Sequence, residues 1–570
     1  MQQSISHSSQ NSITSNPTKS SKIHPLIQIL NKKILSEESM IQKFLSSNSK
    51  AFTTAEYIPD QDEELPKFLN QYQKALKTQQ KLSIFSYFVN FRISSEAKYL
   101  LSTIKYLSSL STLSLTLSDC SLNNQPIFLK ALSKSFTSLK NLTHLEISFI
   151  SVKFQDPRPL RILLKCLKKL PNLTNLAFIF QYKSSFNNEV IAQNFSLYLS
   201  KLTQLRALKL SFDHTIKTTD QEIIQLSSAF KRFTQLTKLD INFSMKIRTS
   251  TLLNLFTSLQ NVSDLALDLS RYRVFTENDD DVETALTHLD CSKLNKLHLY
   301  LFGNYNEKCF TQLSIMLQKA TLLTTLCLEF PPTRSLHEVG DEVLDLLTTL
   351  SSLSALTSLQ LIFPSSLKIK DLALHITTLL PPLTQLTHLT LDFQADNETE
   401  SSHFQQLFSN IRQLNSLKYL DLCFPSEKTI TDESLFTLAE SLKGKIQLRN
   451  LALDFGRESQ MTNKGVYAIL SVIKGMKNLF SLALKFRENE RINEETVNQI
   501  RQTLKYLPVL YFLKLTFQDC GKIASFEGLF EKMKEMRNIT EIDLFLPYSE
   551  SNCKEANYLC KTRTSRIVWA

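Results

Sequence analysis

One eight-residue phrase recurs along the chain, and it constrains the fold more than any other feature. It reads L-x-x-L-x-L-x-F, as in "LTHLTLDF" from Leu386 to Phe393. Sixteen copies fit the phrase, with Phe at position 8 in twelve of them and Leu in the other four. Intervals of 26 to 33 residues between copies predict a linear array of repeats. The copies begin at Ile84, Leu110, Leu142, Leu173, Leu205, Leu236, Val262, Leu294, Leu323, Leu356, Leu386, Leu417, Leu448, Leu479, Leu510 and Ile539.

The phrase and the segments between its copies have different hydrophobic periods. Apolar residues at positions 4, 6 and 8 alternate with positions 3, 5 and 7, as in a strand with one buried face. Segments such as 218–233 and 431–444 place apolar residues three and four apart, as an amphipathic helix does. Asp432 and Asn493 are expected to be helix N-caps. Each unit is therefore one strand and one helix, and it buries its apolar face only by stacking on its neighbours.

On these in-phase copies, the chain resembles the leucine-rich repeat family in its long, helix-containing, ribonuclease-inhibitor-like form, over roughly residues 60–547. The resemblance implies an α/β solenoid, a curved horseshoe with a parallel β-sheet on the concave face and helices on the convex face. The family usually carries Asn or Cys directly after the position that Phe occupies here. This chain has mixed residues there, including Asp213, Ser244 and Pro331. In this it is similar to divergent protist repeats, and we interpret the Phe column as an aromatic ladder that replaces the polar one.

The repeats also set the expected domain boundaries. Residues 1–59 are rich in polar residues and are predicted to be disordered or weakly ordered, and 60–83 are predicted to form an N-terminal capping helix. The solenoid of about 16 repeats is expected to span 84–548. Residues 549–570 are interpreted as a C-terminal cap and basic tail, with a docking tail as the alternative.

Composition points to an intracellular protein. Nine scattered cysteines form no CxxC motif and no zinc-ligand spacing with histidine, which favours a reducing compartment. The N-terminus lacks the apolar segment of a secretory signal, so a cytoplasmic location is expected, with nucleus and mitochondrion left open. No apolar run approaches the roughly 18 residues of a membrane span. The net charge of +11, from 65 basic and 54 acidic residues, does not favour nucleic acid as a partner.

The sequence argues against an enzyme. There are only eight glycines, the first at Gly303, so no phosphate-cradling glycine loop is present. The triplet "DFG" at 454–456 lies on a repeat phrase and has no kinase catalytic loop before it. No nucleophile–base–acid set and no metal constellation stands out. We therefore expect no catalytic residues, no cofactor, no metal and no small-molecule substrate.

Strand alternation predicts which side chains face the concave surface. At positions 3, 5 and 7, ten acids outnumber five lysines, although the whole protein is basic. Sixteen stacked strands would give an inner surface on the order of 75 Å long, which suits a protein partner. The alternative is that these acids are ordinary solvated strand residues. The candidate binding residues for a partner with a basic surface are Asp240, Asp264, Asp268, Glu329, Asp392, Asp421 and Asp454.

The leading functional hypothesis is a non-enzymatic scaffold that binds a protein on its concave sheet face. One alternative is a regulator of a small GTPase, because activators of that kind have repeats of similar length. Those proteins carry an acidic C-terminal segment, whereas this tail is basic. The other alternative is a substrate-recognition adaptor of a ubiquitin ligase. "ELPKFL" at 64–69 resembles the opening of a ligase-recruiting box, but the repeats begin too soon after it for the full module.

Overall fold

The structure is a computed structural model. It describes residues 54–57, 84–90 and 564–569 and, from 104 to 546, the helices, the strands and most of their connections. The longest connections that fall outside this description are 119–131 and 270–284. The predicted capping helix at 60–83 also lies outside the described residues, as does most of the segment 1–59.

The recurring phrase forms one long parallel sheet. Eighteen strands follow one another in chain order, and each described pairing is parallel. The strands are β1 (Thr54–Tyr57), β2 (Ile84–Asn90), β3 (Thr112–Ser118), β4 (His144–Ile150), β6 (Asn175–Gln181), β8 (Ala207–Phe212), β9 (Lys238–Asn242), β10 (Asp264–Asp268), β11 (Lys296–Tyr300), β12 (Thr325–Glu329), β14 (Ser358–Ile362), β16 (His388–Asp392), β18 (Tyr419–Cys423), β19 (Asn450–Arg457), β20 (Ser481–Arg487), β21 (Phe512–Gln518), β22 (Glu541–Leu546) and β23 (Thr564–Trp569).

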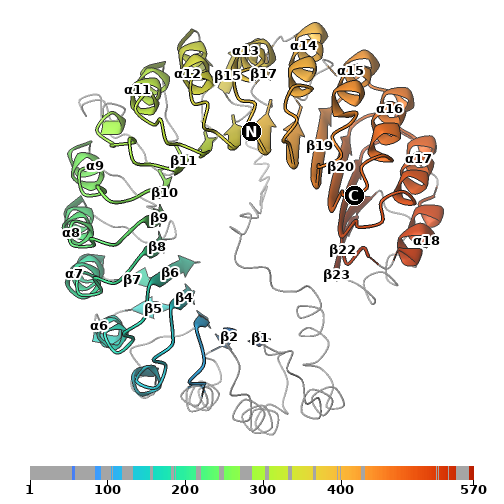
Figure 1. The fold of residues 1–570 in the computed structure, drawn as a ribbon. Coiled ribbons are helices and arrows are strands. Elements are labelled where there is room, and N and C mark those ends of the chain that lie inside the picture. Colours follow the sequence, from blue (N-terminus) through green and yellow to red (C-terminus); the bar gives the residue numbers. More distant parts are fainter. Residues whose placement is uncertain are drawn as a thin grey trace, which may run out of the picture.

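Helices lie between the strands in sequence and outside them in space. Figure 1 shows the strands on the inner side of an arc, the helices on its outer side, and β1 and β23 at its two ends. This is the α/β leucine-rich-repeat solenoid, with a concave sheet and convex helices, that the sequence predicts. The described helices are α6 (Arg158–Leu167), α7 (Asn188–Leu199), α8 (Asp220–Phe230), α9 (Thr249–Phe256), α11 (Glu307–Leu317), α12 (Asp341–Ser351), α13 (Leu372–Leu379), α14 (Ser401–Ile411), α15 (Asp432–Leu442), α16 (Asn463–Ile473), α17 (Glu494–Leu504) and α18 (Glu527–Glu535).

Two small parallel sheets form beside the main one, in the connections that lead from strand to helix. One joins β5 (Lys153–Phe154) to β7 (Ser185–Phe186). The other joins β13 (His337–Val339), β15 (Leu367–Lys370) and β17 (Asp396–Asn397). They bond successive repeats along the connections as well as along the strands.

Strand register confirms the repeat phase in all but the first copy. Leu389 pairs with Leu420, for example, and both hold position 4. In the first copy, Ile84 pairs with Thr112, which holds position 3, so the phrase there begins at Leu82 rather than at Ile84. A shift of two residues keeps every side chain on the same face of a strand, so alternation alone does not distinguish the two alignments.

The sheet continues by one strand beyond the phrase copies at each end. Strand β1 lies within the segment 1–59 and pairs with β2. Strand β23 lies within the segment 549–570 and sets Trp569 opposite Leu546, which holds position 8. The only tryptophan of the chain thus takes the register position of the Phe column.

The core is a column of leucines and phenylalanines between the sheet and the helices. Neighbouring position-8 rings stack: their centroids are 4.9 Å apart for Phe149 and Phe180, and 5.0 Å apart for Phe330 and Phe363. Stacking continues through Phe393, Phe424, Phe455, Phe486 and Phe517 at centroid distances of 5.2 to 6.3 Å. All five of these rings are fully buried. Offset-stacked rings add to the energy of simple area burial, so the ladder stabilises contacts between repeats.

Helix capping agrees with the prediction at one position and corrects it at the other. Asn493 is the N-cap of α17, and its side chain accepts a hydrogen bond from the N–H of Glu495 at 2.9 Å. The N-cap of α15 is Thr431, not Asp432. Asp432 instead accepts hydrogen bonds from the N–H groups of Thr462 (2.7 Å) and Gly465 (3.1 Å), at the start of α16. It therefore satisfies the first turn of the next repeat's helix, a link that its place in the sequence conceals.

The described helices include none that is long and apolar enough to cross a bilayer. The cysteines that the structure describes are all free thiols: Cys166, Cys291, Cys309, Cys327, Cys423 and Cys520. Burial raises the pKa of the Cys291 and Cys520 thiols to about 12. These two are therefore protonated and unreactive near neutral pH.

Candidate functional site: the concave face of the sheet

The concave face is formed by side chains at positions 3, 5 and 7. In β16, Leu389 and Leu391 are fully buried, whereas His388, Thr390 and Asp392 between them are half-buried. The buried side chains point towards the helices, so the others face the inner side of the arc (Figure 1). The same alternation holds in the other central strands β10, β11, β14 and β18.

The seven candidate acids are distributed over six strands of this face. Asp240 lies on β9, Asp264 and Asp268 on β10, Glu329 on β12, Asp392 on β16, Asp421 on β18 and Asp454 on β19. Six of them are half-buried, and Asp454 is buried. The strand register therefore spreads them along the arc instead of gathering them at one point.

On the N-terminal side of this face, two of the acids form ion pairs with lysines of the preceding strand. Lys209 Nζ lies 2.7 Å from Asp240, and Lys238 Nζ lies 3.3 Å from Asp264. Each pair joins residues that are directly opposite in register. On the C-terminal side, Lys514 and Asp543 form the same kind of pair at 2.5 Å across β21 and β22. These carboxylates are already neutralised within the chain.

Asp454 contacts two cations of the next strand. Its side chain is only 3% exposed and contacts Lys485 Nζ, at 3.2 Å, and the guanidinium of Arg487. Gly456, with φ 71°, lies in a β-bulge between Asp454 and Arg457, and the N–H of Gly456 donates to Asp454. A left-handed φ favours glycine at a bulge. The "DFG" triplet is thus a strand, a buried ring and a bulge, and its aspartate is held by two cations of the next strand.

Glu329 is in a different environment. It pairs in register with Tyr300, which in turn pairs with Asp268. Burial raises the pKa of the Glu329 carboxyl, a hydrogen bond with Tyr300 opposes that rise, and the charge of Asp268 adds to it. The ring of His298 lies 4.4 Å from that of Tyr300, and burial lowers the pKa of His298, so this imidazole is neutral near pH 7. The hydrogen-bond donor at this carboxylate is a tyrosine.

Asp421 has a similar environment on β18. The hydroxyl of Tyr419 donates to Asp421 Oδ2 at 3.3 Å, and the ring of His388 stacks on Tyr419 at 5.9 Å. Burial raises the pKa of the Asp421 carboxyl, Lys485 and the Tyr419 hydrogen bond lower it, and Asp454 raises it further. A carboxylate, a tyrosine and a histidine thus occur together twice, once on β11 and β12 and once on β16 and β18.

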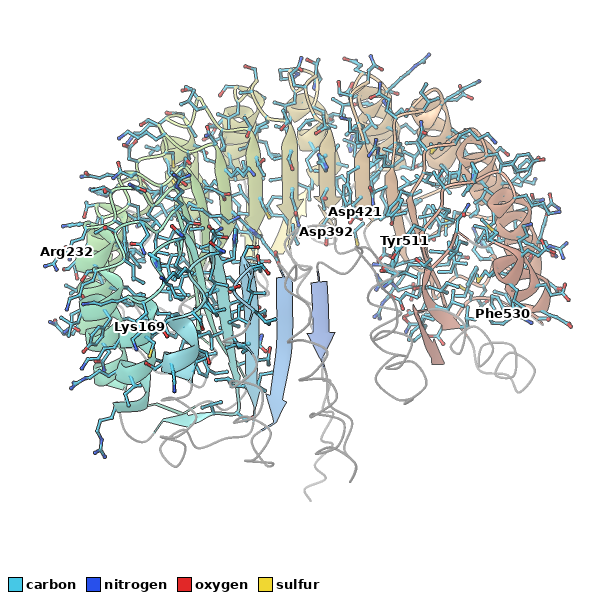
Figure 2. The ribbon with its side chains drawn as sticks, turned by 60° about the horizontal axis from the view of Figure 1, so that its bottom comes forward. Lys169, Arg232, Asp392, Asp421, Tyr511 and Phe530 are labelled. Atoms are coloured by element: carbon cyan, nitrogen blue, oxygen red, sulfur yellow. The ribbon has the colours of Figure 1, made fainter. Side chains whose placement is uncertain are left out.

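These two sets lie within reach of one ligand. Strands β12, β14, β16 and β18 are consecutive in the sheet, so Glu329 and Asp421 are three strand spacings apart, about 14 Å across the strands. Glu329 is in register with Cys423, two residues after Asp421, so the two acids are also offset by about 7 Å along the strands and lie about 16 Å apart. Figure 2 shows Asp392 and Asp421 close to each other on the inner side of the arc, with Tyr511 further towards the C-terminal end. We call the strands from β11 to β18 the central face.

Several residues that define the site were not among the sequence candidates. Tyr300 and Tyr419 occupy inward positions 7 and 3, so the alternation places them on the face, but a count of charges passes over them. Arg487 lies one residue beyond the eight-residue phrase, on a strand that runs past it. His298 and His388 also lie on the concave face, and each packs on a tyrosine. Within the described residues, no group of three or more His, Cys, Asp or Glu could hold a metal ion.

Comparisons with known proteins give a likeness of fold at low sequence identity. No protein-family model matches the chain, and no curated protein matches it. Among solved structures, the chain is similar to the yeast Rad7 and Elc1 complex, at 15% identity and a TM-score of 0.36, over 85% of this chain and 94% of that one. It is also similar to the TLR13–ssRNA13 complex, at 17% identity and a TM-score of 0.32, over 78% of this chain and 59% of that one. A third similar structure is the leucine-rich repeat-containing protein LegL7 from Legionella pneumophila, at 14% identity and a TM-score of 0.30, over 63% of this chain and 96% of that one.

Proposed function

We propose that this leucine-rich-repeat solenoid is a non-enzymatic scaffold that binds a basic segment of a protein partner on its central face. The observation that carries the proposal is the environment of Glu329 and Asp421. Burial raises the pKa of both carboxyls, and a tyrosine donates a hydrogen bond to each. The ionised form of each group is therefore costly in the free protein.

A cation from a partner would reverse that cost. An opposite charge within about 4–6 Å favours the ionised carboxylate, and hydrogen bonds from Arg or Lys to a carboxylate are stronger than those from neutral donors. Asp240 and Asp264 already have lysines at 2.7 and 3.3 Å, so an incoming cation would have to compete with these lysines. Asp454 has two cations of its own. The gain from a basic partner is thus greatest on the central face, at Glu329 and Asp421.

The spacing of the two carboxylates suggests the form of the partner segment. A separation of about 16 Å on the diagonal across the strands corresponds to roughly four to five residues of extended chain. A partner segment that crosses the strands and carries two basic residues about four positions apart would engage Glu329 and Asp421 together. The tyrosine rings beside both carboxylates would pack on the apolar stems of Arg or Lys.

Two other functions remain predictions from the sequence alone: regulation of a small GTPase and substrate recognition for a ubiquitin ligase. Either protein would also act by binding another protein. Affinity capture of the full-length chain from its native cell, with identification of the partner by mass spectrometry, would separate these functions from a general scaffold role.

The direct test compares two double variants that remove the same charge from the same face. Glu329→Gln with Asp421→Asn alters the central face, and Asp240→Asn with Asp264→Asn alters two acids that are already paired. Binding of the full chain to fluorescein-labelled peptides would be measured by anisotropy over a salt series. The peptides carry two Arg residues, four positions apart or adjacent.

We expect the four-apart peptide to bind the unaltered chain more tightly than the adjacent one. The central variant should weaken that binding about tenfold, and the paired-acid control should change it by less than about twofold. Thermal unfolding confirms that both variants fold. Equal losses of affinity in the two variants would contradict the proposal, because the effect would then depend only on the net charge of the face. A chain that binds neither peptide would also contradict it.

A further inference from the structure

The C-terminal repeats expose large apolar side chains far from the central face. Of nine exposed large hydrophobic residues among those that the structure describes, six lie between 436 and 509, with 44 to 62% of their surface exposed. We call these six the C-terminal apolar surface. They are Phe436, Ile446, Tyr467, Phe480, Tyr506 and Val509. Scattered exposed apolar residues need no explanation, but a contiguous patch marks an interaction site.

Part of this surface is a groove between α15 and α16. The groove has a volume of about 690 Å³, and Phe436, Ile446, Ala468, Val472 and Met476 are among its lining residues. Gly444, with φ 83°, ends α15 there, and a Cβ at this position would meet nothing within 4 Å. Ile446, two residues further on, is 62% exposed, the highest value of the six. The groove is wide enough to receive an apolar side chain from outside.

The surface continues from the groove along the edge where helices end and strands begin. Asn478 Nδ2 donates to Ile446 O at 2.9 Å, so the turns of these two repeats are in contact. Lys477, beside Asn478, donates from Nζ to Tyr506 O of the next repeat at 3.1 Å and lies 5.0 Å from the centroid of the Tyr506 ring. Phe480 stacks on Tyr511 with ring centroids 4.8 Å apart. These contacts join the turns of three successive repeats, each of which carries exposed apolar residues of this surface.

The charge beside this surface is mainly positive. Residues 459–487 and 501–518 contain no Asp or Glu. Lys477 and Lys505 are exposed, and Lys474 lies 5.6 Å from the centroid of the Tyr467 ring. Glu440 is the acid among the groove's lining residues, and Lys443 pairs with it at 3.5 Å. A partner that binds here meets apolar side chains surrounded by ammonium groups.

We propose that the C-terminal apolar surface is a second docking site, and that it takes an acidic protein segment with an aliphatic or aromatic anchor. The anchor enters the groove between α15 and α16, and the flanking carboxylates meet Lys474, Lys477 and Lys505. Such a segment complements both properties of the surface, its apolar groove and its positive edge. This site goes beyond the proposed function, because its charge is opposite to that of the central face and it lies on the helix side and edge of the solenoid.

The aromatic contacts favour a protein segment over single-stranded nucleic acid. A base needs the open face of a ring for stacking. Here Lys477 lies over Tyr506, and Phe480 and Tyr511 stack on each other. The exposed aliphatic residue Ile446 and the groove beside it provide no stacking platform, but they do accept a Leu or Phe side chain.

The test uses fluorescein-labelled peptides of about 15 residues in which one Leu or Phe is flanked by Glu and Asp, with the full-length chain. A second series replaces the anchor by Ser, and a third replaces the acids by Lys. Two double variants alter the surface: Phe436→Ser with Ile446→Ser, and Lys474→Glu with Lys477→Glu. Leu322→Ser is the matched control, because Leu322 is 56% exposed in a repeat outside the C-terminal apolar surface.

We expect the acidic anchored peptides to bind, and each double variant to weaken binding about tenfold while Leu322→Ser leaves it unchanged. Glu329→Gln with Asp421→Asn should also leave it unchanged, which separates this site from the central face. Thermal unfolding checks that every variant folds. Four outcomes would overturn the proposal: failure of every acidic anchored peptide to bind, equal binding of the Ser series, an equal loss in Leu322→Ser, or surface-dependent binding of phosphatidylserine vesicles or oligothymidine without peptide binding.

Discussion

Acidic side chains on the central face and in the C-terminal arm of the same sheet have different neighbours. In the arm, from β19 to β22, Asp454 and Asp543 have Lys or Arg from an adjacent strand within 3.2 Å. On the central face, Glu329 and Asp421 have tyrosines as hydrogen-bond donors, and burial raises the pKa of both carboxyls. The backbone pairing is parallel in both regions, and the strands are in phase up to the bulge that follows Asp454.

The difference teaches that the fold does not decide which acids are available to a partner. The side chains beside each acid decide it. Lysine in register on the neighbouring strand completes an ion pair, as at Asp240, Asp264 and Asp454. Tyr300, in register with Glu329, and Tyr419, two residues before Asp421 on the same strand, leave carboxylates that a partner's cation would still stabilise. A count of acids on the face therefore overstates the number that a partner can use.

The largest predicted loss of stability comes from the aromatic ladder, which runs through both regions. Phe393→Ala near the central face and Phe455→Ala in the arm each remove a fully buried ring from the aromatic ladder. Each should lower the free energy of unfolding by about 3–5 kcal/mol, because a cavity forms in a packed core. Urea unfolding followed by circular dichroism measures both. A much smaller loss at one position would show that the ladder does not stabilise the two regions alike.

The next effect should occur in the arm alone. Asp454→Asn leaves Lys485 and Arg487 close together without their shared carboxylate. We expect a loss of about 2 kcal/mol in urea unfolding, below the 3–5 kcal/mol typical of a broken buried pair, because both cations remain partly exposed. A loss as small as that of Asp264→Asn would contradict the distinction between buried and exposed pairs.

Removing the charge of Glu329 or Asp421 should not destabilise the protein, in contrast to Asp454→Asn. A carboxyl with a raised pKa binds its proton more tightly in the folded than in the unfolded chain, so its contribution to stability falls as the pH rises from its ordinary pKa through the raised one. Glu329→Gln and Asp421→Asn remove that loss and should be neutral or stabilising at pH 7, within about 1 kcal/mol. Thermal unfolding from pH 4 to 8 measures it. A clear destabilisation at pH 7 would mean that the carboxylates are already satisfied within the chain.

The smallest effect should come from an exposed pair. Asp264→Asn removes the contact with Lys238, whose side chain is 54% exposed. Exposed ion pairs contribute at most about 1 kcal/mol, so a loss below about 0.5 kcal/mol is expected in urea unfolding. A loss that equals that of Asp454→Asn would remove exposure as the reason for the contrast between the two pairs.

Much of the fold follows from the sequence. The alternation of positions 4, 6 and 8 with 3, 5 and 7 predicts the buried and inward faces, and the recurrent Phe predicts the ladder. Both depend on short-range periodicity, which one sequence displays. The first copy shows the limit: Leu82 and Ile84 are equally good starting points by alternation, and only the pairing of Ile84 with Thr112 decides between them.

Less of the candidate site could be predicted, because it depends on contacts between residues about 30 positions apart. The two cations at Asp454 are examples: Arg487 lies beyond the phrase, and the bulge at Gly456 changes the local register. Asp432 is another, since it bonds the start of the next repeat's helix. Each contact requires the relative position of two repeats, which the period of one repeat does not contain.

The aromatic ladder also has an evolutionary consequence. Because most repeats present a similar ring to a similar ring, a duplicated or deleted repeat would find a compatible neighbour on each side and create no new core. Such an exchange between adjacent copies would lengthen or shorten the solenoid while moving Glu329 and Asp421 apart or together in steps of about 4.8 Å. Recombination could therefore change the distance between Glu329 and Asp421 without a substitution at either residue.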